Sequence, residues 1–300
     1  MSPDRIALVV NPTSGKGRGL TIGRSVHSKL TSDGFEVLPA WGTSAEETSA
    51  RLHAIVNDGV EAVFAVGGDG LVNLAIDVVA GTATPVGLIP AGTGNDLAHA
   101  LGLAIGKPEL SLASAVEALR RRRSRPVDAV KVIGAETDRW FACVLGAGFD
   151  SVVNERANQL RWPKGPQRYN LAIAMELPRF KPIDFKVTID GVSYDGPMML
   201  VALGNARSYG GGIKITPDAE LDDGLIDVCL LGPVSLSEFV RTLPKARSGK
   251  HVEHPQVRII RGREVRLESE GVVAYADGER FGRLPITCTS VPGAVRLLSA

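Results

Sequence analysis

The sequence lacks the features of membrane-spanning and disulfide-stabilised proteins. It has no run of eighteen apolar residues, because polar residues, glycine and proline interrupt its most apolar stretch, 75–90. Its three cysteines, Cys143, Cys229 and Cys288, are far apart and outside any C-x-x-C spacing. This pattern indicates reduced thiols and excludes a disulfide framework and a zinc knuckle. The apolar run 6–10 is too short for a signal peptide, so we expect a cytoplasmic protein.

An excess of charge of one sign is also missing. Lysine and arginine number 34 against 33 aspartates and glutamates, which gives a net charge of +1. Because nucleic-acid-binding proteins usually carry a strong basic excess, we expect no nucleic-acid partner. The 300 residues are 44% apolar and 22% charged, the composition of a folded chain long enough for two domains.

The first part of the chain alternates short apolar runs with helical patterns. One of the helices opens with the capping pattern Ser44-x-x-Glu47. Buried strands are expected at 6–10, 35–40, 60–66 and 86–90. This alternation predicts a parallel sheet with helices on both faces, which is a three-layer α/β domain over residues 1–125.

From about Pro126 the pattern changes to short β-rich runs separated by turn residues. We predict a second, mostly antiparallel domain over residues 126–300, whose last strand is free to return to the first domain. Helical insertions are expected at 151–161, 168–177 and 235–247.

Three glycine-rich segments, 11–19, 67–73 and 91–98, each follow a predicted strand and precede a predicted helix. In open α/β sheets, backbone amides and helix N-termini at such strand ends bind phosphate. None of the segments has the spacing of a Walker A loop or of G-x-G-x-x-G, which disfavours a P-loop NTPase and a Rossmann dehydrogenase. One such segment alone is explained as well by a tight turn. Three after neighbouring strands predict a single phosphate-binding edge.

Asp69 and Asp96 belong to two of these segments and would meet at this edge. Two carboxylates beside a phosphate site repel the phosphate unless a cation lies between them. The arrangement therefore predicts Mg²⁺.

The ordered motifs NPTSG (11–15), GGDG (67–70), GTGNDLA (92–98) and DGE (277–279) resemble the diacylglycerol kinase catalytic-domain family. This family includes bacterial soluble lipid kinases and the sphingosine and ceramide kinases. GGDG alone is shared with NAD kinases and phosphofructokinases, but the combination is specific and covers nearly the whole chain. The resemblance implies an α/β nucleotide-binding domain followed by a β-sandwich. It also implies ATP- and Mg²⁺-dependent transfer of the γ-phosphoryl group to a primary hydroxyl of a lipid such as diacylglycerol, in phospholipid metabolism.

Roles for individual residues follow from the same resemblance. Leu71 stands where the family usually has threonine, which removes one hydroxyl near the phosphates. The positions that match ATP-binding residues are Asn11, Thr13, Ser14, Gly15, Lys16, Gly17, Thr43, Gly67, Gly68, Asp69, Gly70, Leu71, Val72, Asn73 and Thr93.

The resemblance further implies the metal ligands and the catalytic groups. Asp69, Asp96 and Asp128 match positions that hold a catalytic Mg²⁺ through water. Asp277 matches the proposed general base for the lipid hydroxyl. A separate structural Mg²⁺ site would use the side chain of Asp223 and the backbone carbonyls of Glu220 and Leu225.

The residues themselves leave simpler interpretations open. Asp277-Gly278 is one of seven Asp-Gly pairs, which are common in hairpin turns. Asp128 lies in a strand pattern and could supply its polar face. Ser14 and Lys16 need not act as a nucleophile and its base, because phosphoryl transfer to an alcohol requires no covalent intermediate. His251 and His254 are expected in a solvated turn, and no zinc site is expected.

Two segments are candidates for transient contact with a membrane. The arginine-rich run 120–125 is explained better by a solvated helix end than by contact with anionic lipid headgroups. The aromatic and basic segment 160–180, with Trp162, is explained equally by a helix that packs between domains. The alternative functions are a kinase of a soluble substrate, NAD or a sugar phosphate, and a nucleotide-binding regulator without turnover. A homodimer is left open.

Overall fold

The computed structural model describes residues 4–160, 162–163 and 166–299. The chain forms two compact units, one of Met1–Ala129 with Val291–Ala300 and one of Val130–Ser290. Strands β5 (Arg125–Gly134) and β16 (Ile286–Leu297) run from one unit into the other. The division thus falls after residue 129, a little beyond the expected boundary at 125, and residues 291–300 belong to the first unit.

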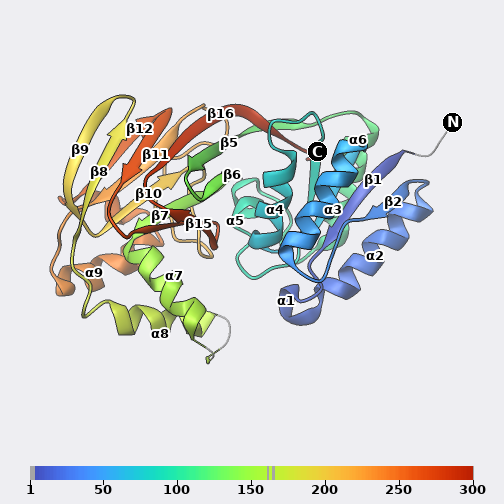
Figure 1. Ribbon diagram of the computed structural model, residues 1–300. Helices are drawn as coiled ribbons and strands as arrows, with labels where there is room; N and C mark the ends of the chain where they lie inside the picture. Colours follow the sequence, from blue (N-terminus) through green and yellow to red (C-terminus); the bar gives the residue numbers. More distant parts are fainter. Residues whose placement is uncertain (1–3, 161, 164–165, 300) are drawn as a thin grey trace. The chain divides into compact units, whose positions relative to one another are not determined.

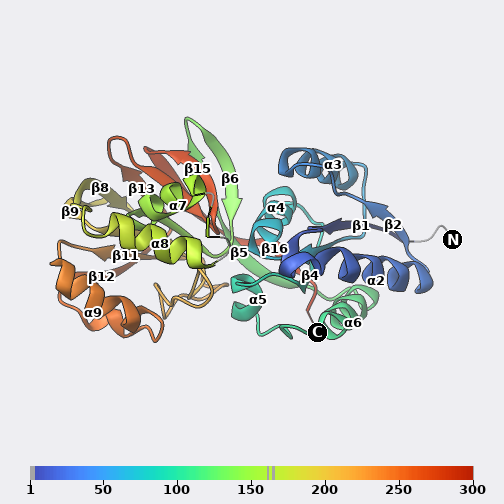
Figure 2. The same ribbon diagram turned by 90° about the horizontal axis from the view of Figure 1, so that it is seen from below.

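The first unit is built on a parallel sheet in the order β2-β1-β3-β4, which the end of β16 extends through Leu297 beside Val86. The strands are β1 (Arg5–Val10), β2 (Glu36–Pro39), β3 (Ala62–Gly67) and β4 (Val86–Pro90). The helices are α1 (Ser14–Gly17), α2 (Gly19–Ser32), α3 (Ala45–Asn57), α4 (Asp69–Val79), α5 (Asp96–Ala100) and α6 (Pro108–Arg120). Figures 1 and 2 show α2 and α6 on one face of this sheet and α3 and α4 on the other.

Alternating residues of the strands build the two faces of this sheet. Ile6, Leu8 and Phe64 are fully buried and pack with Leu30 of α2 and Leu112 of α6 in one core. The intervening strand residues are buried as well, so both faces are apolar, as expected for a parallel sheet covered by helices. The predicted three-layer α/β architecture is confirmed.

The second unit is antiparallel. One of its sheets has the order β12-β11-β10-β7-β14-β15, and in the other the first part of β16 pairs with β13, β13 with β8 and β8 with β9. Its remaining strands are β6 (Thr137–Phe141), β7 (Val144–Gly148), β8 (Ile183–Ile189), β9 (Val192–Met198), β10 (Leu200–Gly204), β11 (Ile226–Leu231), β12 (Val257–Gly262), β13 (Glu264–Glu268), β14 (Val273–Ala276) and β15 (Glu279–Arg283).

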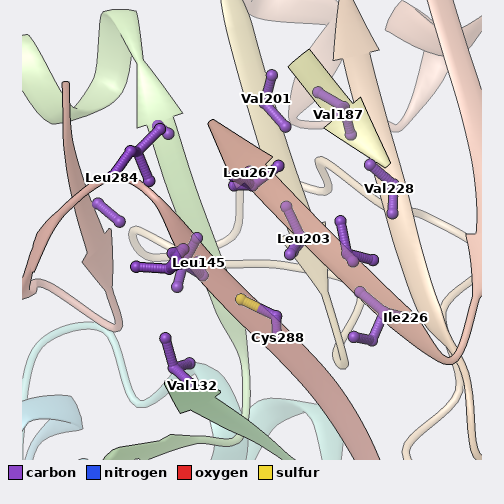
Figure 3. Packing of buried hydrophobic residues seen from close by; sticks show 14 of the residues in the cluster. Val132, Leu145, Val187, Val201, Leu203, Ile226, Val228, Leu267, Leu284 and Cys288 are labelled. Carbon is purple, nitrogen blue, oxygen red and sulfur yellow. The ribbon is translucent and has the colours of Figure 1, made fainter. Parts of the chain in front are cut away.

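Side chains from both sheets of the second unit meet in one apolar core. Figure 3 shows Val201, Leu203 and Val228 of one sheet near Leu267 and Cys288 of the other. All these residues are buried, and the other two cysteines are buried too. The predicted β-sandwich is therefore confirmed.

Three helices cover the outer face of the six-stranded sheet: α7 (Phe149–Gln159), α8 (Pro166–Glu176) and α9 (Leu236–Ala246) (Figures 1 and 2). Phe149 is the centre of this layer, because its ring contacts those of Phe180 and Phe239 edge-on at 5.1 and 5.0 Å. Among the described residues, no helix combines the length and the apolar character needed to cross a membrane.

The arginine-rich run begins at the end of α6, as predicted. Arg120 donates to the carbonyl of Asp33, and its guanidinium lies over the ring of Phe35 at 5.9 Å. Arg121 pairs with Glu117 one turn earlier. These contacts agree with the interpretation of a solvated helix end.

Asp150 is a half-buried acid at the start of α7. One carboxylate oxygen, Oδ2, accepts the hydroxyl of Tyr209 at 2.8 Å, while Oδ1 is buried without a partner. A Cβ on Gly146 would lie 2.1 Å from Oδ2, so only glycine leaves room for this carboxyl group. Burial raises the pKa of Asp150 from 3.8 to about 6.

This pKa predicts a pH-dependent effect of Asp150→Asn on stability. A carboxyl whose folded-state pKa is raised stabilises the fold most below pH 3.8, and this contribution is lost as the pH rises through about 6. The amide does not ionise, so the stability of the variant relative to the wild type should rise by roughly 1–2 kcal/mol between pH 5 and pH 8. Urea unfolding of both proteins at the two pH values measures this, and a pH-independent difference contradicts it.

Candidate functional site

The predicted phosphate-binding residues follow four neighbouring strands of the first unit. Thr43 comes after β2, Asn11 after β1, Gly68 after β3 and Thr93 after β4. Because these strands are parallel and adjacent in the order β2-β1-β3-β4, their carboxyl ends share one edge of the sheet.

Asn11 organises the first glycine-rich segment, which is largely helical. Its Oδ1 accepts the amide and the hydroxyl of Thr13, at 3.0 and 2.8 Å, and its carbonyl accepts the hydroxyl of Ser14 at 2.9 Å. The amide of Asn11 donates to Val66 of β3, which ties the segment to the next strand. Thr13 and Ser14 therefore use their hydroxyls within the loop. The side chain of Lys16 lies outside the described part of the structure.

The three segments meet through glycines. A Cβ on Gly92 would lie 2.3 Å from the Cα of Gly68, and one on Gly15 would lie 2.6 Å from the carbonyl oxygen of Ala91. Gly15 also has φ of +56°, which favours glycine. The first and second segments thus both lie against the third, as the sequence predicts, and side chains are excluded where the backbones touch.

Asp69 connects the second segment to the third. Its Oδ2 accepts the amide of Asn95 at 2.8 Å and its Oδ1 the amide of Asp96 at 2.6 Å, where α5 begins. Asn95 has φ of 56°, and its side chain accepts the amide of Gly92 and donates to the carbonyl of Gly92. Asp69 is itself the first residue of α4. One carboxylate therefore fixes the starting points of two helices.

Asp96 lies beside Asp69. A Cβ on Gly94 would be 2.5 Å from Oδ2 of Asp69 and 3.5 Å from Oδ2 of Asp96, so both carboxylates border the same small space. Asp128, in β5, is buried and accepts the amide of Gly293 at 2.8 Å. It is thus not on a solvated polar face of its strand. Within the described ranges, no three or more acidic, histidine or cysteine side chains form a group that could hold a metal directly.

Two of the predicted ATP-binding residues, both in α4, are buried. Leu71 is buried, and its side chain lies against Gly67, so it offers nothing polar. Asn73 is also buried, and neither its Oδ1 nor its Nδ2 has a hydrogen-bond partner. Gly68, Asp69 and Gly70 at the start of the helix remain partly accessible. The accessible part of this segment is the helix N-terminus, whose amides lack intrahelical partners.

Thr43 is held by the third helix. Its amide and hydroxyl both donate to Glu47 Oε2, at 2.6 and 2.7 Å. Ser44 caps the helix by accepting the amide of Glu47 at 3.2 Å, which confirms the predicted cap. The Thr43 donors lower the pKa of Glu47, and Arg51 adds to this.

Asp277, in the second unit, is both a turn residue and a hydrogen-bond acceptor. It joins β14 to β15 with Gly278, and both residues have positive φ, 51° and 86°. This is the hairpin geometry that Asp-Gly pairs favour. Its Oδ1 accepts the amide of Val144 at 3.1 Å, and its Oδ2 those of Ala142 and Cys143 at 3.4 Å. The half-buried carboxylate is thus fixed at the start of β7.

Asp223 lies in a loop before β11. Its Oδ1 accepts the amide of Leu225 at 3.0 Å, and its Oδ2 is 3.8 Å from Nη1 of Arg261. Arg261 also pairs with Asp227 at 3.1 Å and donates to the carbonyl of Asp218. Burial raises the pKa of Asp227, and hydrogen bonding to Arg261 opposes this. A guanidinium thus supplies positive charge beside the position where the resemblance implies a structural cation.

The prediction of a solvated turn at His251 is wrong. This residue lies in a short 3₁₀ helix, η1 (Lys250–Glu253), and its ring is buried, with Nε2 3.0 Å from the carbonyl oxygen of Ile215. Burial lowers the pKa of His251. His254 is only partly buried, and its Nδ1 accepts the amide of Gln256.

Sequence patterns gave no reason to select Asn95 or Asp150. Asn95 lies within the GTGNDLA motif, where its αL conformation and two bonds to Gly92 close the loop. Asp150 follows an ordinary apolar strand, and only the fold reveals its buried pairing with Tyr209.

Comparisons with known proteins cover both units. Residues 5–132 match the diacylglycerol kinase catalytic domain, and residues 143–299 match the YegS C-terminal NAD kinase beta sandwich-like domain. The chain is 36% identical over 296 residues to a diacylglycerol kinase of Mycobacterium tuberculosis, covering 98% of this chain and 94% of the other. It is 29% identical to a diacylglycerol kinase of Bacillus subtilis, covering 94% and 91%.

Solved structures show the same fold. A diacylglycerol kinase of Bacillus anthracis, 20% identical, aligns with a TM-score of 0.71 over 100% of this chain and 98% of the other. An NAD kinase of Archaeoglobus fulgidus in complex with ATP, 14% identical, aligns with a TM-score of 0.58 over 98% and 93%. The match to the diacylglycerol kinase catalytic domain and the identity to the mycobacterial enzyme over nearly its whole length show that the chain belongs to the diacylglycerol kinase family and is a kinase.

Proposed function

We propose that this kinase transfers the γ-phosphoryl group of ATP, with Mg²⁺, to a primary hydroxyl of a membrane lipid such as diacylglycerol. It acts in phospholipid metabolism, as a cytoplasmic protein that contacts the membrane transiently. The relatives named diacylglycerol kinase support the lipid substrate. The observation that carries the proposal is the convergence of three glycine-rich segments beside two carboxylates at one sheet edge.

ATP phosphates suit this edge. Where Gly15, Gly68 and Gly92 lie against neighbouring backbone, no side chain separates a ligand from the amides. The accessible start of α4 offers amides without intrahelical partners to an anion. We assign ATP binding to this cradle and to Asn11, Thr43 and Thr93 around it.

The neighbouring carboxylates suit a hard cation. Asp69 and Asp96 border one space, and carboxylate oxygens are the ligands that Mg²⁺ prefers. Mg²⁺ usually keeps several of its water ligands. Asp69, Asp96 and Asp128 can therefore hold the ion through these waters, without all three carboxylates reaching it directly. When bound, the ion would neutralise charge on the phosphates. We propose Asp223, with the carbonyls of Glu220 and Leu225, as a second, structural cation site.

Asp277 is assigned as the general base. Three amides hold its carboxylate in one orientation, and only an oriented acceptor can take a proton from an alcohol as the phosphoryl group arrives. An intact acid here also favours an enzyme over a regulator without turnover.

The single most informative experiment identifies the acceptor. Purified protein is incubated with γ-labelled ATP and either total lipid extract, NAD or sugar phosphates. Label in a lipid fraction supports the proposal. Label in NAD or a sugar phosphate instead assigns a soluble substrate, and ATP binding without label in any fraction assigns a regulator.

Asp69→Asn should abolish kinase activity. The amide cannot supply the charge that the metal needs, and it has only one oxygen to accept the two amides of Asn95 and Asp96. We expect turnover to fall at least about 100-fold and stability to fall by about 1–3 kcal/mol. Lipid phosphorylation and urea unfolding measure the two effects. Asp58→Asn, which only breaks an exposed pair with Arg5, serves as the control. Wild-type turnover in Asp69→Asn contradicts the metal site.

Asp277→Asn should suppress turnover by about 10²- to 10⁴-fold and change ATP affinity by only a few-fold. Asparagine tolerates the αL conformation of this turn, so the hairpin is kept.

Asp190→Asn is a matched control for this variant. Asp190 also precedes glycine, has φ of 46°, and accepts the amides of Arg263 and Glu264. It shares the structural role of Asp277 without the proposed catalytic one. Similar turnover in the two variants, or an equal loss of ATP binding and turnover in Asp277→Asn, indicates that Asp277 is structural.

A further inference from the structure

Helix α9 exposes more apolar surface than the second unit covers. Leu236, Val240 and Leu243 lie on one face of the helix, at spacings of four and three residues, and expose 50%, 51% and 37% of their surface. The adjoining face carries Phe239 and Ala246, which are buried. Phe239 contacts Phe149 in the layer formed with α7 and α8. The apolar side of α9 thus extends beyond the residues that pack against the second unit, and the rest of it is exposed to solvent.

Exposed basic side chains lie elsewhere on α9 and directly after it. Arg241, Lys245, Arg247 and Lys250 are all exposed. Among the residues that the structure describes, no ion pair within 4.0 Å involves these four side chains, and Arg241 donates to Ser237 instead. The one acid of residues 236–250, Glu238, accepts the hydroxyl of Ser235 at 2.6 Å in a capping box. The segment therefore presents a net positive charge to the surroundings.

A cavity beneath α9 does not account for the exposed apolar stripe of Leu236, Val240 and Leu243. Its apolar lining includes Leu200, Leu231, Phe239 and Leu243, and its volume is about 60 Å³. Ligand pockets usually measure roughly 300–1,000 Å³, so this cavity is too small for a lipid chain. Leu236 and Val240 do not line this cavity, and Leu243, which does, still exposes 37% of its surface.

An apolar face combined with a polar face that carries lysine and arginine is typical of helices that lie in the plane of a membrane surface. Helix α9 has 11 residues and cannot span a bilayer, which takes about 20. The basic residues complement anionic headgroups, and the stripe complements the acyl boundary below them. No comparable charge complementarity exists for a second copy of α9, because two such surfaces repel each other.

We propose that α9 is a membrane-docking helix that lies in the surface of a bilayer containing anionic lipid, with Leu236, Val240 and Leu243 inserted. The inference rests on the proposed function, because a lipid kinase must reach a substrate that lies in a bilayer. It assigns the docking surface to α9 rather than to the arginine run 120–125 or to Trp162, which is also exposed.

Insertion can be measured without activity. Cys143, Cys229 and Cys288 are buried, so a cysteine introduced as Val240→Cys is labelled selectively with an environment-sensitive fluorophore. The emission of the label should shift to the blue on vesicles of phosphatidylcholine with phosphatidylglycerol, and spin labels on the acyl chains should quench it. Leu110→Cys is the matched control, since Leu110 is a helix leucine of the first unit with 56% exposure. Its label should not change.

The double variant Leu236→Ser, Val240→Ser tests the contribution of the stripe to binding. Co-sedimentation with the same vesicles should fall at least tenfold, since each large apolar side chain removed from an apolar environment changes partitioning by that order. Leu110→Ser should bind as the wild type does. Wild-type binding should also weaken on pure phosphatidylcholine and at high salt. Phosphorylation of a short-chain soluble lipid should be the same in all variants.

The results separate the docking proposal from the proposed function. Insertion at position 240 without phosphorylation of any lipid supports docking and overturns the lipid kinase activity. Phosphorylation in vesicles without insertion overturns docking by α9 and leaves the activity in place. A label shift that depends on protein concentration and not on vesicles assigns the surface to a second copy of the chain and overturns the proposal. Loss of binding in Trp162→Ala with none in the double variant also overturns it.

Discussion

The carboxylate of Asp69 determines how the phosphate-binding edge of the first unit is built. Asp69 is the first residue of α4, directly after the loop that follows β3. Its carboxylate accepts the amides of Asn95 and Asp96, where α5 begins. Amide bonds to a charged acceptor are stronger than those between neutral groups. The loops after β3 and β4 are therefore held in contact at Gly68 and Gly92, where a Cβ on Gly92 would lie 2.3 Å from the Cα of Gly68. The close approach of the two backbones depends on the same carboxylate that we assign to the metal.

The local geometry of Asp69 and Asp96 supports the proposed binding of a cation. The two amides orient the Asp69 carboxylate, so little reorganisation is needed when a cation arrives. Asp96 adds a second negative charge beside it while being largely buried. Two carboxylates that border one space offer oxygen ligands to a hard cation, which favours cation binding at the phosphate edge.

The sequence predicted the first unit well because each of its elements has a local cause. Apolar strand runs, the Ser44 cap and the glycines at the strand ends are all visible in the order of the residues. The αL turn at Asn95 and the burial of His251 were not predictable, because they depend on contacts with Gly92 and Ile215. Asp150 shows the same limit, since its raised pKa follows from burial within the fold, and the hydroxyl of Tyr209, which opposes the rise, comes from 59 residues away. The docking face of α9 needed the fold as well, because helical spacing alone does not tell which apolar residues remain exposed.

The turn and the general-base interpretations of Asp277 are compatible. Asp190 has the same αL conformation before glycine and the same amide acceptance, so local structure alone does not distinguish the two residues. Their surroundings do. Asp190 is exposed, whereas Asp277 is half-buried against a segment that is bonded from its other side: Asn205 donates to the carbonyls of Ala142 and Cys143. The amides that hold Asp277 are thus themselves immobilised, and a base that has to meet one hydroxyl in one orientation requires such support.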